Sequence, residues 1–340
     1  MPHNPPQHIN RLLLFKIGAL GDVLLTTPLV RALRQRFPGA QINYLTGRWS
    51  APALQNNPHI SNLIEFDDQI ISHRNVLKLL SLAAGIRRKK YDVIFVLDPG
   101  WQAGLLTSFF GSFRVGFDRG GEGKFHHLTI SFQSTQHDSE QYLALGNLVG
   151  ARSNNTSLEL FRTTDDESVA GHLLKDSSRP CIALCPGGAR NPYQDMPERR
   201  WPAAYYHELA TKLEAVGFSV VILGNQADAG TARKVATQRS LNLAGRTNLH
   251  QAAAVVSKCR AAVTHDQGLL HVAATTHTPT ISLFGPTDPR RKRPLGEQHR
   301  VIWHAAEPCE HNGKLKQCSP THDMRSISVA KVLEAVITVQ

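Results

Sequence analysis

The residues of this 340-residue chain that are best suited to chemistry stand in polar loops that contain glycine. The first loop is Lys16-Ile17-Gly18-Ala19-Leu20-Gly21-Asp22-Val23. Gly18 and Gly21 allow a sharp turn and the close approach of a ligand. Asp22 would stand in the first turn of a helix, where it could take a proton from a bound hydroxyl. Helix capping and interaction with the helix dipole are the alternative roles for this residue.

A second loop, in the other half of the chain, is suited to an anion. Gly187 and Gly188 follow an apolar segment, and backbone amides in such a loop can line an anion site. Arg199 and Arg200 precede a helix that begins near Pro202, and guanidinium groups bind phosphate in a bidentate manner. The alternative is a solvated basic loop that is anchored by the packing of Trp201.

Two further turns carry polar side chains after apolar runs. The segment Thr264-His265-Asp266-Gln267-Gly268-Leu269-Leu270-His271 predicts a strand end, a turn and a helix start, and helix N-terminal amides hold phosphates without a metal. His271 would add a donor there, or serve only the packing. Asp228, after Leu223, could bind a ribose hydroxyl or cap a helix.

The elements that must position these loops alternate between strand and helix, which predicts parallel sheets. Strands are expected over Arg11–Ile17, Gln41–Leu45, Asn62–Phe66 and Val93–Leu97, and again over Cys181–Cys185, Ser219–Leu223, Ala261–Thr264 and Thr280–Phe284. Asp22–Phe37 predicts one helix, and the last helix, about Val329–Ile337, could pack on either domain. We therefore predict an α/β protein with two doubly wound, Rossmann-like domains, 1–160 and 161–340. Their loops would face a shared crevice.

Bulk properties limit the class of partner. The net charge of +11 favours an anionic partner, and the chain has no pattern typical of nucleic-acid binding. No apolar run reaches the roughly 18 residues of a membrane span, and no signal peptide is evident, so we expect a cytoplasmic protein. The first loop also lacks the G-x-G-x-x-G fingerprint, which argues against a dehydrogenase.

The five cysteines predict reduced thiols. Cys181, Cys185 and Cys259 fall in apolar segments and are expected in the core. A second group has the residue types of a zinc site but matches no standard finger, so a loop of reduced thiols is preferred; it comprises Cys309, His311, Cys318 and His322. No acidic D-x-D pair stands at a strand end, and no metal is expected.

Taken together, these motifs resemble glycosyltransferase family 9, the bacterial lipopolysaccharide heptosyltransferases. The resemblance covers nearly the whole chain and rests on these segments in order: Gly21-Asp22, Thr27-Pro28, Leu33-Arg34, Arg199-Arg200-Trp201-Pro202, Asp266-x-Gly-x-x-His271 and Phe284-Gly285-Pro286-Thr287. It implies a GT-B fold, in which two Rossmann-like domains face a central cleft. It also implies inverting, metal-independent transfer of heptose from ADP-L-glycero-β-D-manno-heptose to the lipid-anchored inner core.

The resemblance also implies roles for particular residues. Asp22 would be the general base, and Arg199 stands where the family usually has a phosphate-binding Lys. Asp228 would lie near the ribose, and the donor sugar and diphosphate would be held by Asp266, Gln267, Gly268 and His271. Gln267 stands where Thr or Ser is usual. Another nucleotide sugar or acceptor, or a binding protein without turnover, is the alternative. An anionic lipid-linked acceptor implies peripheral contact with the inner face of the membrane.

Overall fold

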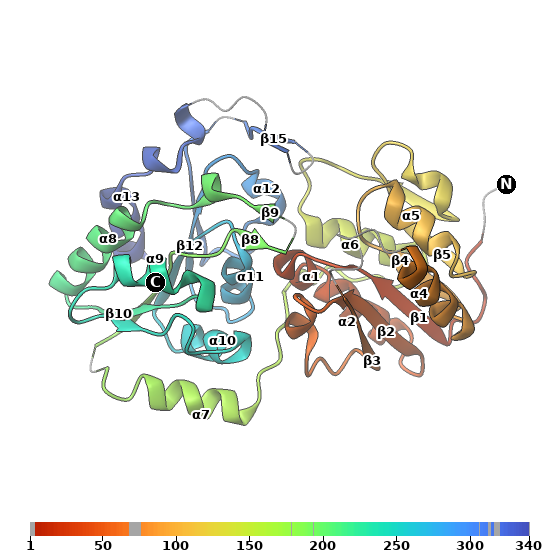
Figure 1. The fold of residues 1–340 in the computed structure, drawn as a ribbon, viewed down its shortest axis with the longest axis horizontal. Coiled ribbons are helices and arrows are strands. Elements are labelled where there is room, and N and C mark those ends of the chain that lie inside the picture. The colour runs from red at the N-terminus through yellow and green to blue at the C-terminus, as the bar shows by residue number, and fades with distance from the viewer. Residues whose placement is uncertain are drawn as a thin grey trace. The chain divides into compact units, whose positions relative to one another are not determined.

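The computed structural model describes residues 4–67, 76–177, 179–192, 194–305, 307–311, 314–315 and 320–339. The chain divides into two compact units, Met1–Glu159 and Leu160–Gln340 (Figure 1). None of the helices in the described part of the chain combines the length and the apolar character that a membrane span needs.

The first unit contains a parallel six-stranded sheet in the order β3-β2-β1-β4-β5-β6. Its strands are β1 (Arg11–Phe15), β2 (Gln41–Gly47), β3 (Asn62–Phe66), β4 (Val93–Val96), β5 (Phe113–Asp118) and β6 (Leu128–Ser131). Its helices are α1 (Leu20–Leu24), α2 (Thr27–Arg36), α4 (Val76–Arg88), α5 (Trp101–Ser108) and α6 (Asp138–Asn147), with 3-10 turns η1 (Ala51–Leu54) and η2 (Glu122–Phe125).

The central strand β1 is buried on both faces, as a parallel sheet requires. Leu13 and Phe15 pack in one cluster with Ala83 and Ile86 of α4. Leu12 and Leu14 alternate with them, and all four β1 side chains are fully buried. The apolar run that predicted this strand therefore reflects cover by helices on each side of the sheet.

The single helix predicted over 22–37 is wrong, because the chain forms α1 and α2 with a break between them. Thr26 and Thr27 turn their hydroxyls back to the carbonyls of Val23 and Leu24, both at 2.7 Å. Pro28 then stands in the first turn of α2, where its missing amide donor is not needed. The apolar spacing continues across this break and so concealed it.

The second unit repeats the architecture with the strand order β11-β10-β7-β12-β13-β14, again parallel. Its strands are β7 (Cys181–Cys185), β10 (Ser219–Ile222), β11 (Leu241–Asn242), β12 (Ala261–His265), β13 (Thr280–Phe284) and β14 (Arg300–Trp303). Its helices are α7 (Thr164–Leu173), α8 (Ala203–Ala215), α9 (Ala229–Val235), α10 (Leu249–Ser257), α11 (Gly268–Ala274), α12 (Pro289–Lys292) and α13 (Val329–Thr338). Two short antiparallel hairpins add β8 (Arg190–Asn191) with β9 (Gln194–Asp195), and β15 (Glu310–His311) with β16 (Lys314–Leu315). Four 3-10 turns are also described in this unit: η3 (Pro197–Arg199), η4 (Gln226–Asp228), η5 (Pro320–His322) and η6 (Met324–Ser326).

Two apolar layers cover this second sheet. Ile182 and Leu184 of β7 pack with α8, α9 and α13, whereas Cys181 and Cys185 face a layer that includes α7, α10 and α11. Cys181, Cys185 and Cys259 are free and buried, as predicted. The last helix, α13, which the sequence left unassigned, packs on α8 in the core of the second unit.

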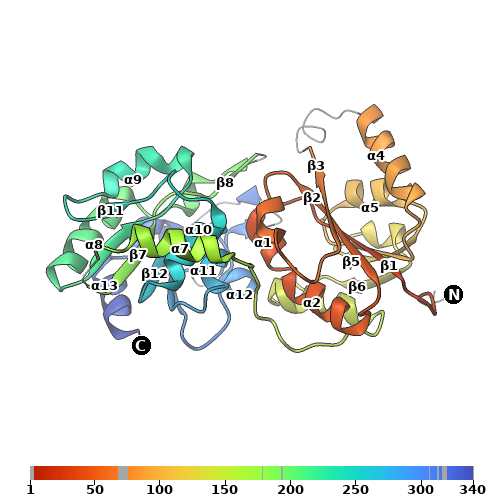
Figure 2. The same cartoon turned by 90° about the horizontal axis from the view of Figure 1, so that it is seen from below.

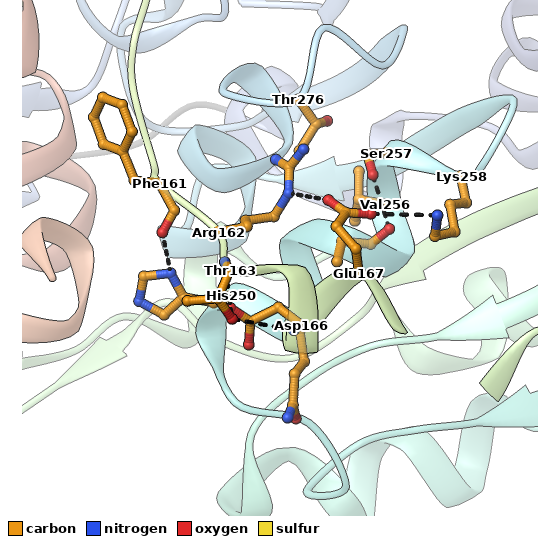
Figure 3. A network of polar contacts seen from close by, with 12 residues as sticks. Phe161, Arg162, Thr163, Asp166, Glu167, His250, Val256, Ser257, Lys258 and Thr276 are labelled. Atoms are coloured by element: carbon orange, nitrogen blue, oxygen red, sulfur yellow. Dashed lines mark hydrogen bonds and ion pairs between the residues drawn. The ribbon is translucent and has the colours of Figure 1, made fainter. Parts of the chain in front are cut away.

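A polar network anchors the start of the second unit (Figure 3). Thr163 and Asp166 form a capping box at the beginning of α7. Arg162 binds Glu167 at 2.7 Å, and Lys258 at the end of α10 lies 3.3 Å from the same carboxylate. Side-chain contacts therefore tie the entering chain to α10.

Candidate functional site

Asp22 lies in the first turn of α1, the place that the sequence predicted for it. The helix begins at Leu20, and its N-cap residue is Ala19, which makes no side-chain cap bond. Asp22 is therefore not the N-cap, although its position still suits the helix dipole. Its side chain is half-buried at the end of the loop that follows β1.

A buried lysine, which the sequence analysis did not single out, lies beside this loop. Lys16 Nζ is 2.9 Å from Asp98 Oδ1 and donates to the carbonyl of Gly18 at 2.7 Å. The other carboxylate oxygen of Asp98 accepts from the amide of Ile17 at 2.6 Å. Burial opposes the charge on Lys16, but the carboxylates of Asp98 and Asp22 outweigh it and raise the pKa of Lys16. Asp22 and Asp98 thus share the field of one ammonium group.

The signal for Asp98 was present in the sequence, because the residue directly follows a buried strand and precedes Pro99-Gly100. It lies at the carboxyl end of β4, and β4 is paired with β1. Parallel neighbours bring their carboxyl ends to one edge of the sheet, which is where α/β proteins bind ligands. The partnership with Lys16 depends on that pairing and could not be inferred from spacing.

The two glycines of the loop have different surroundings. A Cβ atom on Gly18 would lie 3.2 Å from Ser50 Oγ, so the turn passes closely by its neighbour. Gly21 was expected in the same turn, but it is buried inside α1. The reason is that the helix starts one residue before it, at Leu20.

In the second unit, the loop after β7 is packed tightly on Asp228. A Cβ atom on Gly187 would lie 2.2 Å from Asp228 Cγ, so a larger residue does not fit. Asp228 accepts from the amide of Gly188 at 2.9 Å and from the amide of Asn225 at 3.0 Å. The second bond is half of a capping box in η4. Asp228 therefore joins two loops as the N3 residue of the η4 capping box; it is also the N-cap residue of α9 but makes no side-chain cap bond there, and its predicted ribose contact remains a prediction.

Gln267 is turned toward the backbone at the end of β7. Its amide nitrogen donates to the carbonyl of Cys185 at 3.0 Å and to Thr264 Oγ1 at 3.1 Å. Its amide oxygen would lie 2.0 Å from a Cβ atom on Gly188, which has a φ of +76°. Gly188 is thus required both by its backbone conformation and by this contact.

A charged cluster surrounds Asp266 at the end of β12. Arg199 Nη1 lies 3.3 Å from Asp266 Oδ2, and both side chains are largely buried. Burial alone would raise the pKa of Asp266, but Arg199, Lys292 and His271 outweigh it and hold this pKa below its usual value. Gly268 begins α11, and the buried His271 lies one turn inside. Lys292 belongs to α12, in the basic run Arg290-Arg291-Lys292-Arg293, which the sequence analysis did not assign to the site.

Arg200 supports the loop that follows β7. Its Nε donates to the carbonyl of Gly188 at 2.9 Å, and its guanidinium also pairs with Asp195. Trp201 is 1% exposed and donates to the carbonyl of Ile327 at 2.9 Å, so it is the packing anchor that the alternative interpretation expected. The two arginines are therefore part of an ordered site rather than a solvated loop.

These loops follow β7, β10, β12 and β13, which are neighbours in the second sheet. Their carboxyl ends consequently bring together the glycines of one loop, the carboxylate of Asp228 and the cations Arg199 and Lys292. Guanidinium, ammonium and backbone amide groups together suit a phosphate or diphosphate. In the first unit, the corresponding edge offers a carboxylate, Asp22, near a buried ammonium.

The prediction that all five thiols are reduced is wrong, because Cys309 is disulfide-bonded. The chain turns back immediately after Cys309 in the β15–β16 hairpin, and the pair Asn312-Gly313 between the two strands is a hairpin signal that the sequence analysis did not use. Cys318 and the side chain of His311 lie outside the described residues, and His322 Nε2 lies 2.6 Å from the carbonyl of Glu307. A disulfide sulfur is not a thiolate ligand, so Cys309 does not fit the zinc alternative in this state.

Comparison with known proteins gives this geometry a chemical context. Residues 79–321 match the model of glycosyltransferase family 9 (heptosyltransferase). Lipopolysaccharide heptosyltransferase 2 of Escherichia coli K12 is 29% identical over 305 residues, which are 83% of this chain and 85% of that protein.

Two solved structures share the fold. The Escherichia coli ADP-heptose lipopolysaccharide heptosyltransferase II has a TM-score of 0.76 and 26% identity, over 97% of this chain and 98% of that one. A family 9 glycosyltransferase from Veillonella parvula has a TM-score of 0.84 and 22% identity, with 99% of both chains covered. The predicted GT-B fold is thus confirmed. The family model, the relatives and the two polar sheet edges agree, and the chain belongs to glycosyltransferase family 9, the heptosyltransferases.

Proposed function

We propose that this glycosyltransferase moves a heptose from ADP-L-glycero-β-D-manno-heptose to the inner core of lipopolysaccharide. The observation that carries the proposal is the cluster of Arg199, Lys292 and Asp266, which suits a diphosphate in the unit that the resemblance assigns to the donor. The similarity to ADP-heptose lipopolysaccharide heptosyltransferase II supports this donor.

The proposed reaction is a single displacement. An acceptor hydroxyl oxygen attacks the anomeric carbon, its proton passes to the carboxylate of Asp22, and the bond from that carbon to the diphosphate oxygen breaks. ADP leaves from the face opposite the attack, so the configuration at the anomeric carbon inverts. Lys16 stabilises the carboxylate form of Asp22 before the proton is transferred, because a nearby cation favours the anion.

The leaving diphosphate gains negative charge as the bond breaks, and fixed cations stabilise such charge in a site shielded from water. Arg199 and Lys292 would perform this function, with Gly188, Gln267, Gly268 and His271 lining the donor site. We therefore propose that no divalent ion is needed. We also propose that the enzyme works in the cytoplasm, where an anionic lipid-linked acceptor on the inner membrane attracts the chain's surplus positive charge.

The test incubates the purified protein with ADP-heptose and a deacylated inner-core acceptor, with and without EDTA. We expect ADP release, a product heavier by one heptose, and an inverted anomeric centre by NMR. Activity that EDTA abolishes and Mg²⁺ or Mn²⁺ restores would overturn metal independence. ADP binding without turnover on any acceptor would favour a nucleotide-sugar-binding protein, and turnover with another sugar or acceptor would favour a different family 9 transferase. Salt-sensitive binding to DNA or RNA, with no binding to ADP, would contradict the proposed transferase function.

A further inference from the structure

The first unit carries an apolar surface that its own core does not use. Helix α4 packs Ala83 and Ile86 inward, both less than 5% exposed. Its opposite side is also apolar, with Leu77 80% and Leu80 50% exposed. A helix that is apolar on both sides normally has something covering its outer side.

Helix α5 of the same unit also exposes a row of apolar side chains. Trp101, Leu105 and Phe109 follow one another at intervals of four residues, so they line one side of the helix and its C-cap. They are 56%, 38% and 50% exposed. Helices α4 and α5 are in contact and lie side by side (Figure 2). We call the exposed side chains of Leu77, Leu80, Trp101, Leu105 and Phe109 the α4–α5 surface.

Basic residues flank the α4–α5 surface. Residues 76–91 contain Lys78 and the run Arg87-Arg88-Lys89-Lys90 but no Asp or Glu. All four members of the run are exposed. Apolar and aromatic side chains beside Lys and Arg match the boundary of an anionic lipid bilayer, where Trp is favoured at the headgroup level.

The position of the α4–α5 surface relates it to the chemistry of the first unit. Asp98 follows β4 and pairs with Lys16, which follows β1. Trp101 begins α5 three residues after Asp98. The surface therefore starts near the sheet edge that carries Asp22 and extends away along α5. A lipid-anchored acceptor has its sugar end close to a membrane, and this arrangement suits such a substrate.

We infer that the α4–α5 surface docks the enzyme on an anionic membrane, with the apolar side chains in the headgroup region and Arg87–Lys90 on the lipid phosphates. The choice of a membrane that displays the acceptor rests on the proposed function. The basic run favours a bilayer over a second copy of this chain, since two such faces would repel each other.

Vesicle flotation of the full chain tests the inference, with vesicles of 70% phosphatidylcholine and 30% phosphatidylglycerol against pure phosphatidylcholine. We expect binding to the anionic vesicles that weakens with salt. Leu77→Ser with Leu80→Ser, and separately Arg88→Glu with Lys89→Glu, should each lower the partition coefficient at least tenfold. Matched controls in the second unit are Val216→Ser with Ile337→Ser, and Lys212→Glu with Lys234→Glu. These control variants remove similar exposed side chains and should change the partition coefficient less than twofold.

Turnover is measured in parallel on a deacylated acceptor and on the same acceptor in vesicles. The surface variants should retain activity on the first and lose it on the second, with unchanged melting temperatures. No vesicle binding, or equal losses in the controls, would overturn the inference. A change from dimer to monomer in the variants without a change in flotation would assign the α4–α5 surface to self-association instead. Because flotation needs no acceptor, vesicle binding without turnover would contradict only the proposed function.

Discussion

Asp22 lies in the first turn of α1, where a catalytic base and a purely electrostatic partner of the helix are both possible. Asp22→Asn keeps the shape of the side chain but cannot take a proton. We expect kcat to fall 10²–10⁴-fold, the loss typical of a positioned base, with the melting temperature and ADP affinity nearly unchanged. Asp165→Asn removes an exposed first-turn acid from α7 and is the matched control. More than a tenth of the wild-type kcat in Asp22→Asn would assign the proton to another group.

Lys16 is a positioning residue in this scheme, since it acts through Asp22 and the Gly18 carbonyl. Lys16→Met leaves Asp98 without its cation, and breaking a buried pair costs about 3–5 kcal/mol. Adding Asp98→Asn should restore part of that stability. A role limited to folding predicts an unchanged pH profile in Lys16→Met, in which Asp98 keeps its charge. We expect instead that the acid limb of kcat/KM moves to higher pH, because Asp22 is protonated more easily without the nearby ammonium.

Arg199 pairs with Asp266 in the second unit, with Nη1 3.3 Å from Oδ2. Arg199→Ala should weaken ADP binding or lower kcat by tenfold or more, since a lost charge-assisted bond costs about 1.5–3 kcal/mol. Arg199→Lys should recover part of the effect. The control is Arg190→Ala, which removes a largely exposed partner of Asp195 and should leave ADP affinity unchanged. Normal kinetics in Arg199→Ala would move the phosphate contact to another residue, with Lys292 the next to test.

At the scale of the elements, the β7 loop depends on how closely it packs against η4. Gly187→Ala would place a methyl group 2.2 Å from Asp228 Cγ, so one of the two loops must move. We expect a loss of about 1–3 kcal/mol in the free energy of unfolding, together with weaker ADP binding. Gly230→Ala in α9 has nothing within 4 Å and should be neutral or slightly stabilising. Equal stability of the two variants would show that the loop relaxes freely.

The elements themselves were largely predictable. The apolar runs Cys181–Cys185 and Thr280–Phe284 form strands with the bounds that were predicted for them. The edge strands β6 and β14 escaped prediction because they are short and only partly buried. Helix α7 was hidden in a polar stretch, although Thr163 and Asp166 provide a capping-box signature at its start.

For the whole molecule, buried histidines predict how stability depends on pH. Burial lowers the pKa values of His126, His265 and His299 to about 4 in the folded chain, from 6.5 when unfolded. The unfolded chain therefore binds more protons between these values, and stability should fall as the pH decreases from about 6.5 to 4. For the fully buried His265, the shift corresponds to roughly 3 kcal/mol.

Urea denaturation at several pH values measures this effect. His299→Gln removes one of the three histidines that bind more protons in the unfolded chain, so the slope of stability against pH should become shallower. His8→Gln changes an exposed histidine and should leave that slope as it is. A stability that is flat from pH 6.5 to 4.5 would mean that these imidazoles are hydrated in solution.

The sequence by itself determined the two parallel α/β sheets, because residues buried on both faces must be apolar in unbroken runs and the connecting helices must be amphipathic. It also identified the loops that carry chemistry, since polar residues after such runs fall at the carboxyl edge of a sheet. Only the tertiary structure decided which side chains meet there. Lys16 with Asp98 and Arg199 with Asp266 are 82 and 67 residues apart in the chain. Pairing over such separations depends on strand order, and neither local propensity nor periodicity records it.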